Sequence, residues 1–311
     1  MSWLESSPRY RPFLERFPVL RLIGGTRLFP IPGTTDGGAQ ILAKAEWSNP
    51  GGSVKDRPVA QMLLEASIAG ELTPGRRILD SSSGNAGIAY AMIGAMMGVP
   101  VTLVVPGNAS AERKERILAH GAQLRQTDPL EGYDAALREA HRLATSDPAL
   151  YFMPDQYANR HNWMAHYDGT ASEILEQTAG RLTHLVAGIG TGGTLTGVGR
   201  RLKEHDARLR VVCVVPEAFP GIEGLKPLES PQDIVPEILD ASLIDERIRV
   251  STDEAASACL DLARAGLFVG QSSGAYFHAA RQVARREPGA RIVTIFSDLG
   301  ERYFSTRLWR P

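Results

Sequence analysis

Asn49-Pro50-Gly51-Gly52-Ser53-Val54-Lys55-Asp56-Arg57-Pro58 is the stretch that says most about the fold and chemistry of this chain. It joins a Pro-Gly-Gly turn to an apolar pattern of helical period over residues 59–69, which predicts Lys55 at a helix N-terminus. The positive end of the helix dipole disfavours an ammonium there and favours the neutral amine, the form that attacks carbonyl carbons. The stretch therefore indicates a Schiff-base lysine, although a lone lysine beside a turn is more often a solvated surface residue.

Composition is typical of a globular protein with small-molecule ligands. The 311 residues are 43% hydrophobic and 22% charged, with a formal net charge of −1. This length allows two domains, and the balanced charge gives no sign of a nucleic-acid or membrane partner. The short basic clusters Arg113-Lys114 and Arg200-Arg201 are interpreted as solvated helix faces. The cysteines, Cys213 and Cys259, are expected to be buried hydrophobes, and neither they nor the seven histidines have metal-ligand spacing.

One apolar stretch raises the question of a membrane span. Residues 88–105 contain 18 positions without a charge, the lower limit for crossing a bilayer. Because Gly98-Val99-Pro100 interrupts it, we expect a buried helix, a turn and a buried strand. Residues 1–16 carry charges and two prolines but no apolar core, so they are not a signal peptide. These observations predict a cytoplasmic protein.

Strand and helix patterns alternate along the chain. Continuous apolar runs of this kind suit parallel strands covered on both faces. Repeated β-α units predict an α/β fold with two open, mostly parallel twisted sheets and helices on both faces, with ligands at the carboxyl ends of the strands. Strands are expected at 77–80, 101–105, 184–188, 210–215 and 291–296. Residues 216–240 lack periodicity and predict a long excursion, of a kind that is often functional.

Three further loops join an expected strand to an expected helix. The loop at 81–87, Ser-Ser-Ser-Gly-Asn-Ala-Gly, would form an anion site suited to a carboxylate, or a plain helix cap. The loop at 188–194, Gly-Ile-Gly-Thr-Gly-Gly-Thr, would cradle a phosphate, but it also fits a dinucleotide fingerprint whose acidic partner would be Glu217. The loop at 270–275 would offer a hydroxyl to a ligand nitrogen, or again cap a helix. The nicotinamide interpretation explains neither Lys55 nor the serine-rich loop.

The four motifs in this order resemble the fold-type II pyridoxal-phosphate enzymes, and most closely the B type of the cysteine synthase (O-acetylserine sulfhydrylase) family. The resemblance extends over residues 23–306. The similarity to the sulfhydrylase branch lies in residues 155–159, His166 and residues 170–174, and that to the B type in residues 219–222, 240–243 and 298–303.

The chain also departs from that pattern. Gly24-Gly25-Thr26-Arg27-Leu28 stands where the family usually has Gly-Asn-Thr-Pro-Leu. In the serine-rich loop, Ser82 and Ala86 stand where threonine is usual. Ala86 has no hydroxyl, so at that position substrate binding would depend on the backbone.

The resemblance implies a role for each of these residues. Lys55 would hold pyridoxal 5′-phosphate as a Schiff base and move the substrate α-proton. The cofactor phosphate would be bound by Gly190, Thr191, Gly192, Gly193 and Thr194, the ring oxygen by Asn85 and the ring nitrogen by Ser272. The substrate carboxylate would be bound by Ser82, Ser83, Asn85, Ala86 and Gln156. Lys226 would contact a phosphoester substrate, or be a solvated loop lysine.

The resemblance further implies a domain division and a reaction. Residues 1–44 and 154–311 would form a larger cofactor-binding domain, and residues 45–153 a smaller, mobile substrate-binding domain. The reaction would be β-replacement on O-acetyl- or O-phospho-L-serine by a sulfur nucleophile to give L-cysteine, in a homodimer. Sulfide, thiosulfate and a thiocarboxylated carrier protein stay open as sulfur donors. Alternatives are cystathionine β-synthase or another β-replacement enzyme and, more remotely, an NAD-dependent dehydrogenase or a catalytically silent scaffold.

Overall fold

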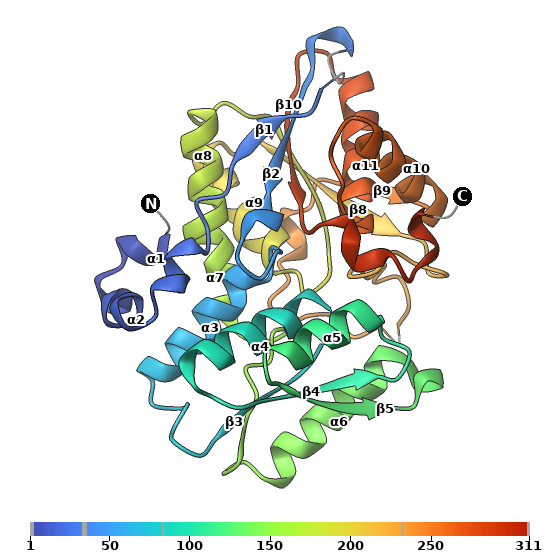
Figure 1. Cartoon of the computed structure of the whole chain (residues 1–311). Helices are drawn as coiled ribbons and strands as arrows, with labels where there is room; N and C mark the ends of the chain where they lie inside the picture. The colour runs from blue at the N-terminus through green and yellow to red at the C-terminus, as the bar shows by residue number, and fades with distance from the viewer. Residues whose placement is uncertain (1–2, 33–35, 83, 232, 310–311) are drawn as a thin grey trace.

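Two β-sheets, each covered by helices, make up the computed structural model, which describes residues 3–32, 36–82, 84–231 and 233–309 (Figure 1). The six-stranded sheet has the order β1 (Leu28–Pro30), β2 (Gln40–Ala45), β10 (Arg291–Phe296), β7 (His184–Gly188), β8 (Arg210–Pro216) and β9 (Glu246–Val250). The four-stranded sheet has the order β5 (Gln123–Thr127), β4 (Val101–Pro106), β3 (Arg77–Ser81) and β6 (Tyr151–Phe152).

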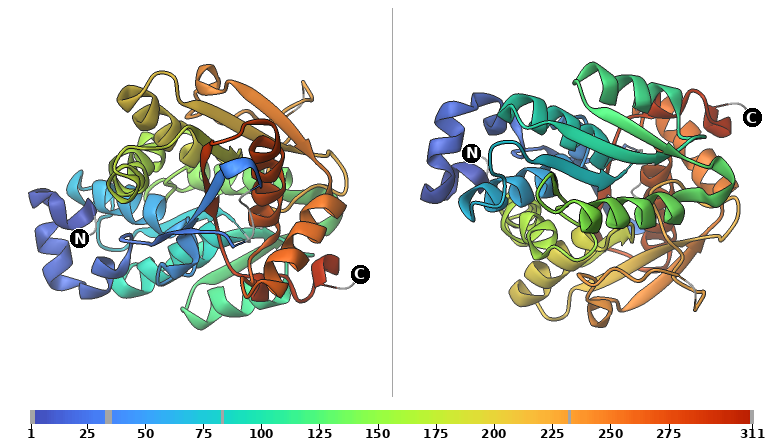
Figure 2. Two further views of the ribbon diagram at one scale, coloured as in Figure 1. Left: turned by 90° about the horizontal axis from the view of Figure 1, so that it is seen from above. Right: turned by 90° about the horizontal axis from the view of Figure 1, so that it is seen from below.

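Every neighbouring pair of strands is parallel except β1 and β2. The five strands expected from apolar runs are β3, β4, β7, β8 and β10, and each matches its expected range to within one residue. Their residues are almost all buried because helices cover both faces of each sheet, as Figure 2 shows. The predicted fold class is confirmed.

Helices connect most of the strands. In the first half of the chain they are α1 (Trp3–Ser6), α2 (Arg11–Arg16), α3 (Asp56–Ile68), α4 (Asn85–Met97), α5 (Ala111–Ala119) and α6 (Gly132–Ser146). In the second half they are α7 (Arg160–Ala165), the π-helix η6 (His166–Ala171), α8 (Ser172–Thr178), α9 (Gly193–His205), α10 (Thr252–Arg264) and α11 (Gln271–Arg286). Short 3-10 helices used below are η4 (Glu46–Ser48), η7 (Ala241–Leu243) and η8 (Gly300–Tyr303).

The uncharged stretch at 88–105 folds as expected. It forms most of α4, a turn, and β4. Gly98 ends the helix in the left-handed region, with φ of 72°, a conformation that favours glycine. No helix in the described ranges is both long and apolar enough to cross a bilayer. Cys213 and Cys259 are free and buried, as predicted.

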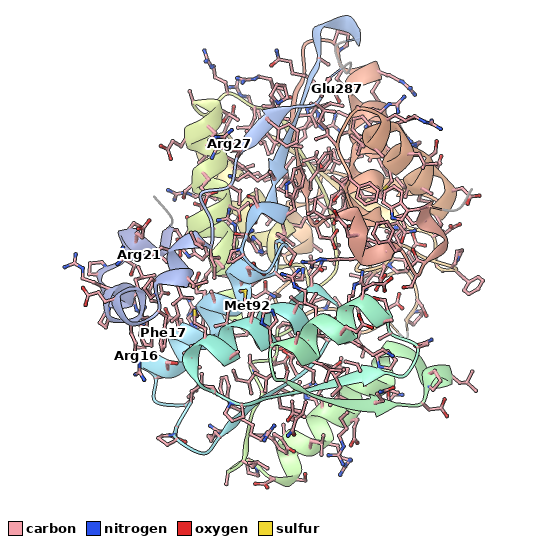
Figure 3. The ribbon with its side chains drawn as sticks, in the orientation of Figure 1. Arg16, Phe17, Arg21, Arg27, Met92 and Glu287 are labelled. Carbon is pink, nitrogen blue, oxygen red and sulfur yellow. The ribbon has the colours of Figure 1, made fainter. Side chains whose placement is uncertain are left out.

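The two sheets draw on different parts of the chain. All strands of the four-stranded sheet lie between residues 77 and 152, and those of the six-stranded sheet come from before and after that segment. The N-terminal segment packs on α3 and α4, and Figure 3 labels Phe17 and Met92, two partly buried side chains on that shared apolar core. Residues 217–240 contain no helix or strand in their described part, as expected for the excursion. The division into a larger and a smaller, mobile domain stays a prediction.

Candidate active site

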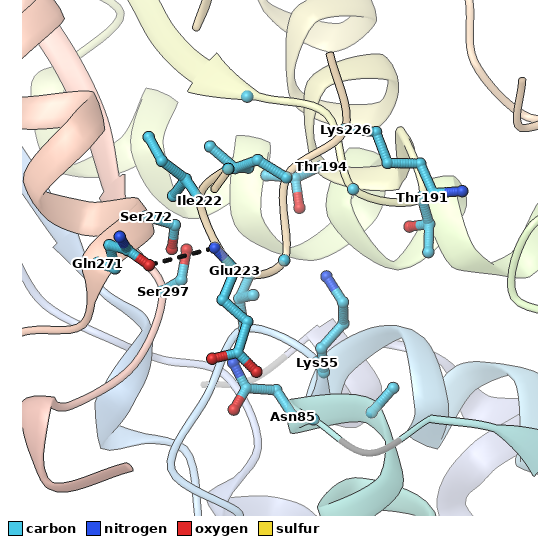
Figure 4. A pocket seen from close by; sticks show the side chains of 18 of the residues that line it. Lys55, Asn85, Thr191, Thr194, Ile222, Glu223, Lys226, Gln271, Ser272 and Ser297 are labelled. Carbon is cyan, nitrogen blue, oxygen red and sulfur yellow. Dashed lines mark hydrogen bonds between the residues drawn. The ribbon is translucent and has the colours of Figure 1, made fainter. Parts of the chain in front are cut away.

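A cavity of about 630 Å³ brings together the residues that the sequence analysis singled out (Figure 4). This volume lies in the range of cofactor and small-ligand sites. Its walls include Lys55, Ser82, Asn85, Ala86, Gln156, Gly190, Thr191, Gly192, Gly193, Thr194, Lys226 and Ser272. Ser83 lies outside the described residues. The four motifs, which are distant in sequence, therefore line one site.

Lys55 occupies the N-cap position of α3, as the opening motif predicted. Its backbone N–H donates to Ser53 Oγ at 3.3 Å, whereas no described residue forms a hydrogen bond or ion pair with its amine. Figure 4 shows the amine pointing into the cavity, with Thr191 and Thr194 across from it. Burial lowers the pKa of Lys55, and the charge of nearby Asp298 only partly opposes this effect. The site thus favours a neutral, nucleophilic amine.

The glycine-rich loop ends at the N-terminus of α9, where close packing requires glycine. A Cβ on Gly193 would lie 2.0 Å from Asn162 Oδ1, and one on Gly190 would lie 2.5 Å from the Gly224 carbonyl oxygen. Gly192 has φ of 84°. The first N–H groups of α9 have no partner in the helix, and Thr191 and Thr194 line the cavity beside them. Such a donor-rich loop at a helix start fits a phosphate.

His166 supports this loop from behind, a contact that the sequence did not indicate. Its Nε2 lies 3.3 Å from Thr194 Oγ1 and its Nδ1 lies 2.9 Å from Thr170 Oγ1. Burial, with the charges of Arg57 and Lys55, holds the pKa of His166 well below its usual value. The neutral ring therefore serves as a hydrogen-bonding support and not as a cation.

In the serine-rich loop the structure shows a serine hydroxyl bonded to the start of α4, and the anion site stays a prediction. Ser82 Oγ accepts a hydrogen bond from the Gly87 N–H at 3.0 Å, as a capping residue would. Ser82 and Ala86 also line the cavity, and Gln156 reaches the same wall from the segment after β6. Ala86 is 3% exposed and presents only its methyl group and backbone. Donors on this wall suit a carboxylate.

Asn85 and Ser272 differ in whether their side chains form hydrogen bonds with other described residues. Asn85 Nδ2 donates to Asp298 Oδ2 at 2.7 Å, and Arg302 donates to Asn85 Oδ1. A cofactor oxygen would have to replace or share the contact with Asp298. Ser272 lies in the first turn of α11, and within the described chain its hydroxyl has no hydrogen-bond partner. It is free to bind a ligand.

Arg113 corrects one expectation. The sequence analysis placed it on a solvated face, but it is 3% exposed and lines the cavity. Its guanidinium lies 4.8 Å from the centre of the Tyr303 ring and pairs with Glu223. The contact of Arg113 with Tyr303 and Glu223 was not predicted, because neither helical period nor local charge shows which distant loop covers a position. Glu217, the acidic partner that a nicotinamide fingerprint would need, instead accepts the Thr252 N–H at 2.6 Å.

A buried cluster of four charged side chains fixes the N-terminal end of α3, next to Lys55. It consists of Lys44, Glu46, Arg57 and Glu173, whose side chains are at most 8% exposed. Arg57 donates two hydrogen bonds to each carboxylate, at 2.7–2.8 Å, and Lys44 Nζ lies 2.6 Å from Glu173 Oε2. The cluster joins β2, η4, α3 and α8. It therefore ties the Lys55 turn to the six-stranded sheet.

Among the described residues, no group of three or more histidine, cysteine, aspartate or glutamate side chains is arranged to hold a metal ion. The site thus combines the Lys55 amine with a glycine-rich loop, a serine-rich loop and the hydroxyls of Thr191, Thr194 and Ser272. The residues fit pyridoxal phosphate, since an unpartnered amine with a lowered pKa faces a donor-rich anion loop across one cavity.

Comparisons with known proteins agree with this geometry. The family described as pyridoxal-phosphate dependent enzyme (PALP) matches residues 19–298. A cysteine synthase of Aquifex aeolicus is 46% identical over 304 residues, covering 94% of this chain and 92% of that protein. Cysteine synthase B of Salmonella typhimurium is 41% identical over 272 residues, covering 87% of this chain and 88% of that protein. The crystal structure of a cysteine synthase from Entamoeba histolytica superposes with a TM-score of 0.88 at 34% identity, covering 94% of this chain and 90% of that one.

Proposed function

Because this chain belongs to the family of pyridoxal-phosphate dependent enzymes, we propose that it makes L-cysteine by β-replacement on an O-activated L-serine. The ester oxygen leaves the β-carbon with its electron pair, and a sulfur nucleophile supplies the pair for the new C–S bond. The observation that carries the proposal is the unpartnered Lys55 amine, which faces the glycine-rich loop across the cavity. The cofactor of the family is pyridoxal 5′-phosphate, and the nicotinamide alternative has no support from the comparisons.

The proposal assigns a binding group to each part of the cofactor. Lys55 would hold its aldehyde carbon, and residues 190–194 would hold its phosphate. Asn85 would contact the ring oxygen and Ser272 the ring nitrogen. When bound, pyridoxal phosphate draws electrons from the substrate α-carbon and so makes the α-proton removable.

Lys55 is the base of the proposed reaction. Its amine takes the α-proton and later returns it to the same carbon of the product. Because burial lowers the pKa of Lys55, more of the amine is neutral near pH 7 than for an exposed lysine. Ser82, Ala86 and Gln156 hold the substrate carboxylate and thereby orient the α-proton toward this amine.

Ser272 directs the outcome of the reaction. A serine hydroxyl cannot hold the ring nitrogen protonated as a carboxylate would, so electron withdrawal is weaker. Elimination of a good leaving group is then favoured over transamination. The partly buried cavity shields the reacting carbons from water.

The proposal also covers the substrates, the location and the oligomeric state of the enzyme. Its substrates are small molecules, an O-acetyl- or O-phospho-L-serine and a sulfur donor, with a thiocarboxylated carrier protein as one candidate donor. We expect a cytoplasmic homodimer. Size-exclusion chromatography with light scattering tests the oligomeric state, and assays with sulfide, thiosulfate and a thiocarboxylated peptide test the donor.

Borohydride reduction of the purified protein tests the central proposal. The protein should be yellow, and peptide mass spectrometry should find the reduced cofactor on Lys55. With O-acetyl-L-serine and sulfide it should release L-cysteine, and Lys55→Ala should abolish this turnover. An adduct on another lysine, or binding of NADH in place of the cofactor, would refute it.

A further inference from the structure

One wall of the cavity carries a buried arginine with an incomplete set of partners. Arg113, on α5, is 3% exposed, and its Nε has no hydrogen-bond partner among the described residues. Its guanidinium stacks on Tyr303 and forms an ion pair with the Glu223 carboxylate. An arginine offers five donors, and here only part of that capacity is used.

Glu223 reaches Arg113 from the excursion after β8. Its backbone N–H donates to Gln271 Oε1 at 3.2 Å, which fixes this part of the excursion beside α11 (Figure 4). From there its side chain extends across the cavity toward the wall that carries Asn85. The side chain remains 43% exposed, so it can leave Arg113 without a large rearrangement of the core.

A comparison of the charged side chains on the cavity wall shows that Glu223 is the carboxylate paired with a cation there. Among the described lining residues, the basic side chains are Lys55, Arg113 and Lys226, and the carboxylates are Glu217 and Glu223. The Glu217 carboxylate accepts a hydrogen bond from the Thr252 N–H at the start of α10. Glu223 is thus the carboxylate that neutralises a cation of the cavity.

We propose that Glu223 and Arg113 form an anion gate that selects the leaving group of the substrate. With Glu223 on Arg113, a neutral ester enters without electrostatic cost, whereas a dianionic phosphoester meets the carboxylate and must displace it. Once freed, Arg113 would bind phosphate oxygens through paired N–H groups. Glu223 is therefore a specificity-determining residue that favours the neutral ester. This inference rests on the proposed function and names its substrate class.

Glu223→Gln tests the gate, with Glu229→Gln as the matched control. Glu229 lies on the same excursion, pairs with Arg249 at 2.6 Å and does not line the cavity. For the holoenzyme with sulfide, kcat/KM is measured with O-acetyl-L-serine and with O-phospho-L-serine. Glu223→Gln should raise the phospho-to-acetyl ratio on the order of tenfold, and Glu229→Gln should leave it unchanged. In an Arg113→Gln background, Glu223→Gln should no longer change the ratio.

Binding of inorganic phosphate gives a second measurement that does not depend on turnover. Isothermal titration of the holoenzyme should show tighter phosphate binding, by several-fold, for Glu223→Gln than for wild type or Glu229→Gln. An unchanged ester ratio and unchanged phosphate affinity would overturn the gate, as would an equal change for both esters, which indicates a role in closure only. Failure of wild type on both esters would instead refute the proposed function, and the titration would still decide the gate.

Discussion

Replacing Glu173 by glutamine removes one carboxylate from the buried charge cluster that fixes the N-terminal end of α3. Arg57 keeps Glu46 as a partner, but Lys44 has no other carboxylate within ion-pair distance among the described residues. Its side chain is fully buried, so the mutation leaves an uncompensated ammonium or forces it to lose its proton. Breaking a buried pair in this way costs about 3–5 kcal/mol. For a chain of 311 residues that corresponds to a fall in melting temperature of roughly 5–8 °C.

Thermal and urea unfolding of wild type, Glu173→Gln and Lys44→Met/Glu173→Gln measure this effect. The double variant removes both members of the orphaned pair and should recover part of the loss. Glu229→Gln is the control, because its exposed pair with Arg249 contributes about 1 kcal/mol or less. A loss below about 1 kcal/mol for Glu173→Gln, or a double variant less stable than the single one, would refute the reasoning.

The pH dependence provides an independent check on the same carboxylate. Burial alone would raise the pKa of Glu173, but hydrogen bonds and charge from Arg57, together with Lys44, lower it to about 2. A carboxyl whose pKa is lowered by folding stabilises the protein above its unfolded pKa and loses that contribution as pH falls. The difference in unfolding free energy between wild type and Glu173→Gln should therefore narrow from about pH 4.5 toward about pH 2. A constant difference over this range would contradict the assignment.

Two further predictions concern the cavity. Ser272→Asp should place a carboxylate where the ring nitrogen is expected, hold that nitrogen protonated and raise keto-acid formation relative to cysteine; unchanged product ratios would show that Ser272 does not face the ring nitrogen. Lys226 has its amine 5.0 Å from the centre of the Tyr157 ring at the cavity wall. Lys226→Ala should raise KM for O-phospho-L-serine at least several-fold and leave O-acetyl-L-serine nearly unaffected, because one ammonium favours a dianion. Equal losses for both esters would instead indicate a structural role for this lysine.

Local sequence determined the position and order of the chemical motifs. Turn residues followed by a helical pattern placed Lys55 at the start of α3. Glycine or serine loops after apolar runs placed two candidate anion sites at the starts of α4 and α9. Such signals suffice because a strand, a turn and a helix N-terminus depend on residues close together in the chain. The β-α alternation likewise gave two mostly parallel sheets, with ligand loops at the carboxyl ends of the strands.

Only the tertiary structure decided which charged residues are buried and what they contact. Arg113 was expected in solvent, yet Glu223 and Tyr303, more than 100 positions away, cover it. Periodicity describes the face of a single helix and carries no information about the loop packed on it. The same holds for His166 behind Thr194 and for the four-charge cluster around Arg57. Burying a charge is favourable only when distant segments supply its partners, and that condition is met only by the folded chain.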